Sequence, residues 1–180
     1  MSGIGLHASE IECIMSRILE SNKVQWLGVF ARDELPDMRR ARRPFALVFN
    51  SDPRSEPGQH WLAIFGPSQG PLELFDSFGL PLSFYNLDFS STSIPIVYSN
   101  KVIQSPHSAL CGHYCIYFLV SRIYSRSFKY IISYLSNLNH NRNTSDSVVR
   151  TNVHNLKLFY NVISPCTRTG QCSQIKCSFC

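Results

Sequence analysis

The chain has 180 residues, of which 44% are hydrophobic and 16% are charged. This composition excludes a wholly disordered protein, which needs low hydrophobicity and high charge, and the length suits about one domain. The longest purely apolar run, 115–120, is too short to span a bilayer, so we expect no membrane partner. The N-terminus lacks a basic region followed by an apolar core, which predicts that the protein is not secreted.

The net charge of +5 is unevenly distributed along the chain. Residues 1–120 carry nine basic and eleven acidic side chains, whereas residues 121–180 carry eight basic side chains and one acidic side chain. A basic third of this kind indicates a polyanionic partner such as nucleic acid, or else a solvated basic face. A second group of basic side chains supports the first reading: Arg39, Arg40, Arg42 and Arg43.

The hydrophobic pattern predicts a helix, then strands, then helices. Ser9 and Glu12 have the spacing of a capping box, and apolar residues at helical spacing follow over 10–20. Short apolar runs bounded by turn residues predict five strands, at 24–30, 45–50, 60–65, 72–75 and 94–98. The second half predicts three helices, at 110–124, 128–138 and 144–163. This order of elements indicates an α+β fold, with one domain over 1–163 and a C-terminal tail over 164–180.

Cys111 is the residue whose position most suggests chemistry. It falls in the first turn of the helix predicted at 110–124, with Gly112 beside it. A helix N-terminus presents unpaired amides and a partial positive charge, which lower the pKa of a thiol and favour the nucleophilic thiolate. An inert cysteine on a core helix is the alternative interpretation, and it is the one we expect for Cys115, one turn further on.

A nucleophilic thiolate needs a base and a group that orients the base. His60 opens the strand predicted at 60–65, and Asp76 follows the strand predicted at 72–75. If these two strands are antiparallel neighbours, the start of one lies beside the end of the other, and His60 and Asp76 meet at one end of the sheet. Gln104 lies seven residues before Cys111, where its side-chain amide could help to hold an oxyanion.

These residues together resemble a known family. The segments His60-Trp61-Leu62-Ala63, Leu74-Phe75-Asp76-Ser77-Phe78-Gly79 and Gln104 through Gly112 are similar to the adenovirus-type cysteine endopeptidases (adenain) of DNA viruses and Maverick/Polinton transposons. The resemblance spans roughly residues 9–163 and implies an α+β cysteine-peptidase fold with a papain-like site. It assigns Cys111 as nucleophile, His60 as general base and acid, Asp76 as the orienting acid and Gln104 as oxyanion donor.

The resemblance also implies a biological role. A protein of this family is expected to process viral or transposon-encoded capsid and core precursors, in the virion and the host nucleus or cytoplasm. The chemistry needs no cofactor or metal, but DNA and a short basic peptide that contains cysteine are expected to activate the enzyme. The expected partners are therefore polypeptide substrates and, without sequence specificity, nucleic acid bound by 121–180 and by the arginines of 39–43.

Two other functions stay open at this stage. The SUMO- and NEDD8-specific proteases share the order His, acid, Gln, Cys, and the acid Asp76 is compatible with them, although they typically place Gln six residues before Cys. A catalytically silent, DNA-binding virion protein on the same scaffold is the second alternative. The sequence assigns no role to the four cysteines of the tail: Cys166, Cys172, Cys177 and Cys180.

Overall fold

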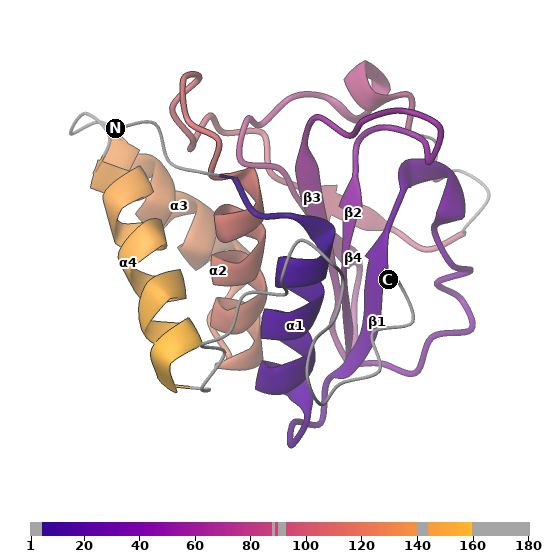
Figure 1. Cartoon of the computed structure of the whole chain (residues 1–180). Helices are drawn as coiled ribbons and strands as arrows, with labels where there is room; N and C mark the ends of the chain where they lie inside the picture. Colours follow the sequence, from indigo (N-terminus) through magenta and orange to yellow (C-terminus); the bar gives the residue numbers. More distant parts are fainter. Residues whose placement is uncertain (1–4, 88, 90–92, 140–143, 160–180) are drawn as a thin grey trace.

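A computed structural model describes residues 5–87, 89, 93–139 and 144–159 and has an α+β fold, as predicted (Figure 1). Its elements in chain order are α1 (Ala8–Leu19), β1 (Gln25–Phe30), the 3-10 helix η1 (Arg32–Glu34), β2 (Phe45–Asn50), β3 (Trp61–Gly66), β4 (Leu72–Phe75), the 3-10 helix η2 (Leu82–Tyr85), β5 (Ile96–Tyr98), α2 (Cys111–Ile123), α3 (Phe128–Asn139) and α4 (Thr144–Phe159).

The five strands form one mixed sheet in the order β1-β2-β3-β4-β5. The pairs β2–β3 and β3–β4 are antiparallel, and the outer strands β1 and β5 run parallel to their neighbours. The antiparallel register pairs Ala63 with Phe75, which brings the start of β3 beside the end of β4. The sheet therefore presents the residues before β3 and after β4 at one edge.

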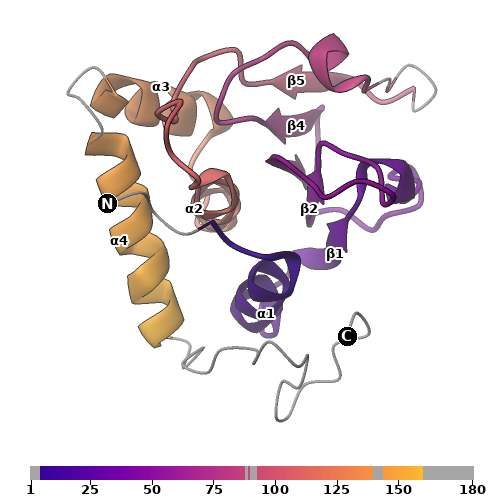
Figure 2. The ribbon, with the colours of Figure 1, turned by 45° about the horizontal axis from the view of Figure 1, so that its top comes forward.

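Both faces of the sheet are buried, because successive side chains of β2 point to opposite faces and all of them are buried. Ala46 and Val48 pack against the helices, whereas Phe45, Leu47 and Phe49 join a second core on the opposite face. Helix α1 covers β1, helix α2 covers β3, and α3 and α4 pack outside them (Figures 1 and 2). On the other face, loops and the two 3-10 helices cover the sheet (Figure 2). The chain thus builds two cores that share a sheet, and burial of apolar surface on both sides stabilises it.

The predicted capping box at Ser9 and Glu12 is wrong. Helix α1 begins at Ala8 with His7 as its N-cap, and the carboxylate of Glu10 accepts a hydrogen bond of 3.0 Å from the His7 amide. Glu12 instead accepts a bond of 2.8 Å from the indole of Trp26. Helix α1 starts earlier because Leu6 and Ile11 belong to the same buried cluster, and this packing fixes where the chain enters the helix.

The remaining elements lie close to their predicted ranges. The short helix η1 lies between the first two predicted strands, and β5 begins two residues after the predicted start at Ile94. The last predicted helix is described as far as Phe159, and the tail over 164–180 lies outside the described residues. Within the described part of the chain, no helix is both long enough and apolar enough to cross a membrane.

Candidate active site

Cys111 is the first residue of α2, in the helix turn where the sequence predicts it, and its side chain is partly exposed. The first amides of a helix have no partner within the helix, so the thiol sits beside unpaired N–H groups and the positive end of the helix dipole. Gly112 packs tightly behind it, because a Cβ there would lie 3.2 Å from atoms of Leu6, Ile11 and Trp61. The N-terminus of α2 is therefore held firmly against α1 and β3.

The loop before His60 is held closed by one asparagine. The side-chain oxygen of Asn50 accepts hydrogen bonds from the amides of Asp52 (3.0 Å) and Gln59 (3.2 Å). Gly58 has a φ of +81°, and a Cβ on it would lie 2.8 Å from the Asn50 side chain, so glycine suits this position. These contacts, with the 2.8 Å bond from the Ser51 amide to the His60 carbonyl, fix the backbone that presents His60.

His60 and Asp76 meet at the sheet edge, as the antiparallel arrangement of β3 and β4 predicts. The His60 Nε2 and the Asp76 Oδ1 are 2.7 Å apart, and both residues are buried. Burial opposes ionisation of His60, but the bonded carboxylate of Asp76 and the neighbouring Cys111 outweigh it and raise the pKa of His60 to about 9.

Asp76 is held by four hydrogen-bond donors. Besides His60, its carboxylate accepts bonds from the amides of Phe78 (2.8 Å) and Leu80 (2.9 Å) and from the hydroxyl of Tyr85 (3.0 Å). Burial raises the pKa of Asp76, but His60 and the two amides outweigh it and lower the pKa below its usual value. Asp76 is therefore an ionised and immobile partner for His60.

The thiol of Cys111 lies near the imidazole of His60, and each group shifts the pKa of the other. The Nε2 of His60 is taken by Asp76, and no nitrogen or oxygen of the described residues bonds to the Nδ1, which leaves that nitrogen for Cys111. Burial opposes thiolate formation, but His60 and the amides of Trp61 and Gly112 lower the pKa of Cys111. A lowered cysteine pKa beside a raised histidine pKa favours a thiolate–imidazolium pair at neutral pH.

The structure brings Gln104 to the same site. Its side chain is buried, its Nε2 donates to the Ser108 carbonyl at 2.6 Å, and its Oε1 accepts from the Ser77 hydroxyl at 2.7 Å. An amide nitrogen carries two hydrogens, so one remains after the bond to Ser108. Gln104 and Cys111 line the same cavity.

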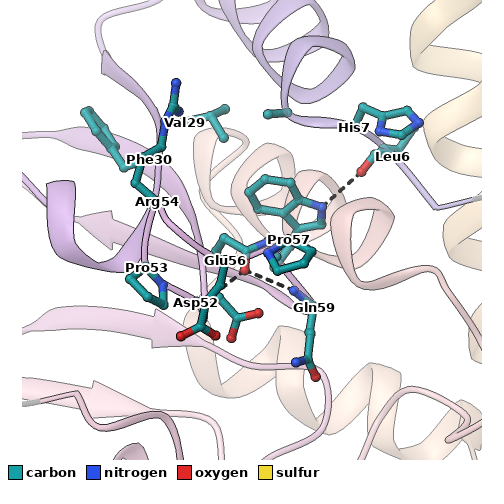
Figure 3. A pocket seen from close by; sticks show the side chains of 15 residues that line it. Leu6, His7, Val29, Phe30, Asp52, Pro53, Arg54, Glu56, Pro57 and Gln59 are labelled. Carbon is teal, nitrogen blue, oxygen red and sulfur yellow. Dashed lines mark hydrogen bonds between the residues drawn. The ribbon is translucent and has the colours of Figure 1, made fainter.

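Three of the four predicted residues, His60, Gln104 and Cys111, line a cavity of about 340 Å³, and Asp76 bonds to His60. An adjoining pocket of about 420 Å³ shares Leu6, His7, Gly58, Gln59 and Trp61 with it, so the two hollows lie side by side and together make a groove along this surface. In Figure 3 the segment with Pro57 and Gln59 lies on one side of this pocket, and Leu6 and His7 lie on the other. A groove of this kind, with a nucleophile at one end, suits an extended polypeptide.

Sequence reasoning missed Tyr85 and Leu6, which contact the site together with Phe78 and Trp61 of the matching segments. Two aromatic rings stack with the imidazole of His60: the Phe78 ring at a centroid distance of 4.6 Å and the Tyr85 ring at 5.8 Å. The Trp61 indole donates a bond of 2.9 Å to the carbonyl of Leu6, which ties the N-terminal segment to the groove. The apolar character of Leu6 was the available signal for its burial, but no spacing rule links Tyr85 to Asp76.

No metal-binding cluster accompanies this site. In the ranges that the structure describes, no group of three or more histidine, cysteine, aspartate or glutamate side chains could hold a metal ion. Cys166, Cys172, Cys177 and Cys180 lie outside the described residues.

Comparison with known proteins decides the family. The sequence profile of the adenovirus endoprotease family matches residues 26–177, which is most of the chain. The chain belongs to the adenovirus endoprotease family. The expected resemblance is thereby confirmed, and the match includes all four predicted site residues.

Individual relatives of this adenovirus-type chain are distant. The protease of Bovine adenovirus C serotype 10 is 33% identical over 88 residues, covering 40% of this chain and 45% of the relative. The protease of Porcine adenovirus A serotype 3 is 27% identical over 114 residues, covering 54% of this chain and 55% of the relative. The chain thus spans about half the length of the curated relatives it matches.

A solved structure shares the fold of this endoprotease-family chain. The crystal structure of the ASFV pS273R protease superposes with a TM-score of 0.53 and 18% identity, covering 72% of this chain and 62% of that one. At this identity the likeness concerns the fold alone, and it agrees with the predicted α+β cysteine-peptidase architecture.

The arginines of the cluster at 39–43 have partners within the molecule. Arg39 and Arg40 both pair with Asp37, at 2.8 Å and 3.6 Å. The guanidinium of Arg43 donates to the carbonyls of Pro67 (3.3 Å) and Gly70 (2.7 Å), which ties it to a neighbouring loop. Asp37 therefore offsets part of the positive charge of the cluster, and the side chains of Arg39, Arg40 and Arg42 remain exposed.

Proposed function

We propose that the protein is a thiol endopeptidase in which Cys111 is the nucleophile, His60 the general base and acid, Asp76 the orienting acid and Gln104 an oxyanion donor. The observation that carries this proposal is the convergence of His60, Gln104 and Cys111 on one cavity from three separate parts of the fold, with Asp76 bonded to His60. Opposite pKa shifts at Cys111 and His60 support it, because nucleophilic catalysis by cysteine needs a thiolate.

The chemistry follows from the geometry. The Cys111 thiolate attacks the carbonyl carbon of the scissile peptide bond, and the carbonyl electron pair moves onto oxygen. The His60 imidazolium then donates its Nδ1 proton to the leaving amine as the C–N bond breaks, which leaves an acyl-thioester on Cys111. A water molecule, deprotonated by neutral His60, attacks the thioester and releases the acid, and the returning proton restores the imidazolium.

Two donors are placed to stabilise the tetrahedral oxyanion. One is the backbone N–H of Cys111, which is unpaired within the helix because Cys111 is the first helical residue. The other is the second hydrogen of the Gln104 Nε2. Preorganised donors of this kind stabilise the transition state more than the ground state.

The groove indicates a polypeptide substrate, and family membership favours viral capsid and core precursors. We therefore propose maturation of such precursors in the virion as the biological role. Two accessory partners remain proposals as well: DNA, and a short basic peptide containing cysteine, as activators rather than participants in the chemistry.

For nucleic acid, the proposed contacts are the basic side chains of 121–180 and the arginines of 39–43, and the former are expected to contribute more because Asp37 offsets part of the charge of the latter. Lys129 and Arg150 are exposed on α3 and α4, and Arg126 is exposed between α2 and α3. Replacing these three residues by Gln is expected to weaken DNA binding more than replacing Arg39, Arg40 and Arg42. Binding should also weaken as salt rises, because phosphate contacts release counterions. Salt-independent binding, or equal losses in the two variants, would contradict this assignment.

The enzymatic proposal is tested with the purified full chain, a capsid precursor from the same virus or transposon and a panel of unstructured peptides. Wild type is expected to cleave the precursor and Cys111→Ala to leave it intact, whereas the control Cys13→Ala, which does not line the cavity, keeps activity. Cleavage confined to the C-terminal tails of ubiquitin-like proteins would favour the SUMO- and NEDD8-protease alternative. Absence of cleavage, with and without DNA and a basic activating peptide, would favour the silent DNA-binding protein.

A further inference from the structure

Ser77 links the segment that carries Asp76 to Gln104, although no role of its own was predicted for it from the sequence. It directly follows Asp76, and it is fully buried. Its backbone carbonyl accepts bonds from the amides of Ile103 and Gln104, both at 2.9 Å, and its hydroxyl donates to the Gln104 Oε1 at 2.7 Å. Ser77 therefore holds both the backbone and the side chain of Gln104.

The hydroxyl of Ser77 bears on the orientation of the Gln104 amide. A primary amide has one accepting end and one donating end, which exchange places when the group rotates by half a turn. The Ser108 carbonyl can only accept, so it selects the Nε2, and Ser77 completes the arrangement by donating to the Oε1. In the rotated state two carbonyl oxygens would face each other, and the Nε2 would turn toward Ser77.

We propose that Ser77 is a positioning residue for the oxyanion site, which it serves by holding the Oε1 end of the Gln104 amide while the Ser108 carbonyl holds the Nε2 end. This inference rests on the proposed peptidase function. Two consecutive residues then have separate roles: Asp76 orients His60, and Ser77 orients Gln104. One short segment after β4 thereby sets the relative placement of the base and the oxyanion donor.

The role of Asp76 toward His60 and the role of Ser77 toward Gln104 can be separated by mutation. The carboxylate of Asp76 is held by His60, Phe78, Leu80 and Tyr85, and none of these bonds involves the Ser77 hydroxyl. Ser77→Ala should therefore leave the thiolate–imidazolium pair intact. It should leave the Gln104 Oε1 without its buried donor, so that the amide is held at its Nε2 end alone, by the Ser108 carbonyl, and is less firmly positioned.

The test is a double-mutant cycle on kcat with wild type, Ser77→Ala, Gln104→Ala and the double variant. Ser77→Ala is expected to lower kcat about tenfold with little change in KM, the scale of one buried hydrogen bond. It should lower kcat no further when Gln104 is already Ala, because the two residues act through one group. Alkylation of Cys111 should be unchanged.

The matched control is Ser145→Ala, which also removes a fully buried hydroxyl, one that donates to the Ile103 carbonyl at 3.1 Å. It is expected to lower the melting temperature without a comparable loss of kcat. If Ser77→Ala does not fold, Ser77→Cys keeps the shape with a weak donor and is expected to show the same kcat loss. An unchanged kcat, or losses that simply add in the double variant, would overturn the proposal.

A second readout does not depend on activity. The side-chain amide signals of Gln104 in a nitrogen-15 NMR spectrum are expected to shift in Ser77→Ala and to stay in place in Ser145→Ala. A wild type that cleaves no peptide would defeat the proposed function, whereas unshifted Gln104 signals in Ser77→Ala would defeat the role of Ser77. The two failures are therefore distinguishable.

Discussion

Cys111 and Cys115 are the same residue type, one turn apart on the same helix, and the structure gives them opposite properties. Cys111 lines the groove beside His60, and its pKa is lowered. Cys115 is completely buried, donates to the Trp61 carbonyl at 3.3 Å, and has a pKa raised well above its ordinary value by burial. Position at the helix terminus and access to an imidazole, rather than the thiol itself, separate a nucleophile from a core side chain.

The largest expected effect tests this contrast directly. Cys111→Ala should lower kcat by about a thousandfold or more, because removing the nucleophile disables the whole catalytic unit. Cys115→Ala should keep kcat within a few fold and lower the free energy of unfolding by about 1–2 kcal/mol, through loss of core packing. Peptide hydrolysis and denaturant unfolding of both variants provide the measurement. Comparable kcat losses in the two variants would remove the distinction.

Gln104→Ala sharpens the comparison by separating thiol activation from oxyanion stabilisation. It should lower kcat by about a hundredfold, the scale for one oxyanion donor. The alkylation rate of Cys111 should stay unchanged, because Gln104 does not contribute to the lowered thiol pKa. Single-turnover kinetics measures the loss of turnover, and mass spectrometry of the alkylated protein measures the alkylation rate of Cys111. Undiminished turnover would show that another group holds the oxyanion.

His60→Ala should weaken the contrast between the two thiols. Without the imidazolium, burial remains and the pKa of Cys111 should rise toward that of an ordinary or buried thiol. At pH 6, alkylation of Cys111 by iodoacetamide should then slow about tenfold for each unit by which the thiol pKa rises above that pH. Alkylation rates measured from pH 5 to 10 test this. A profile that matches wild type would mean that His60 does not activate Cys111.

The pH dependence of turnover gives the smallest of these effects. His60 titrates at about 9, so it holds its proton below that pH and loses it above. Loss of the proton removes the acid that the leaving amine needs, so kcat should fall by up to about tenfold per pH unit above this value. A steady-state profile from pH 7 to 10.5 measures it. An alkaline limb near the ordinary histidine pKa would place His60 in a different environment.

The sequence predicted the parts of the site that depend on regular structure. His60 and Asp76 meet because antiparallel neighbouring strands must bring those ends together, and Cys111 opens a helix because the segment after Leu110 has the pattern of one. The catalytic roles of these residues and of Gln104 stay predictions until they are measured.

The parts that sequence reasoning missed depend on contacts between irregular segments. Tyr85 reaches Asp76 from a 3-10 helix, Leu6 reaches Trp61 across 55 positions, and Ser77 reaches Gln104 across 27 positions. No periodicity encodes such distances, because tertiary packing brings the segments together. The capping-box prediction failed for the same reason, since packing of Leu6 set the start of α1 rather than the local pattern at Ser9.

The most direct test of the central claim is an active-site titration. The purified protein is alkylated in steps, the fraction modified at Cys111 is measured by peptide mass spectrometry, and the remaining peptidase activity is measured in the same samples. Activity is predicted to fall in direct proportion to modification of Cys111 and to reach zero when Cys111 is fully modified, with Cys115 unmodified throughout. Activity that survives complete modification of Cys111 would contradict the account.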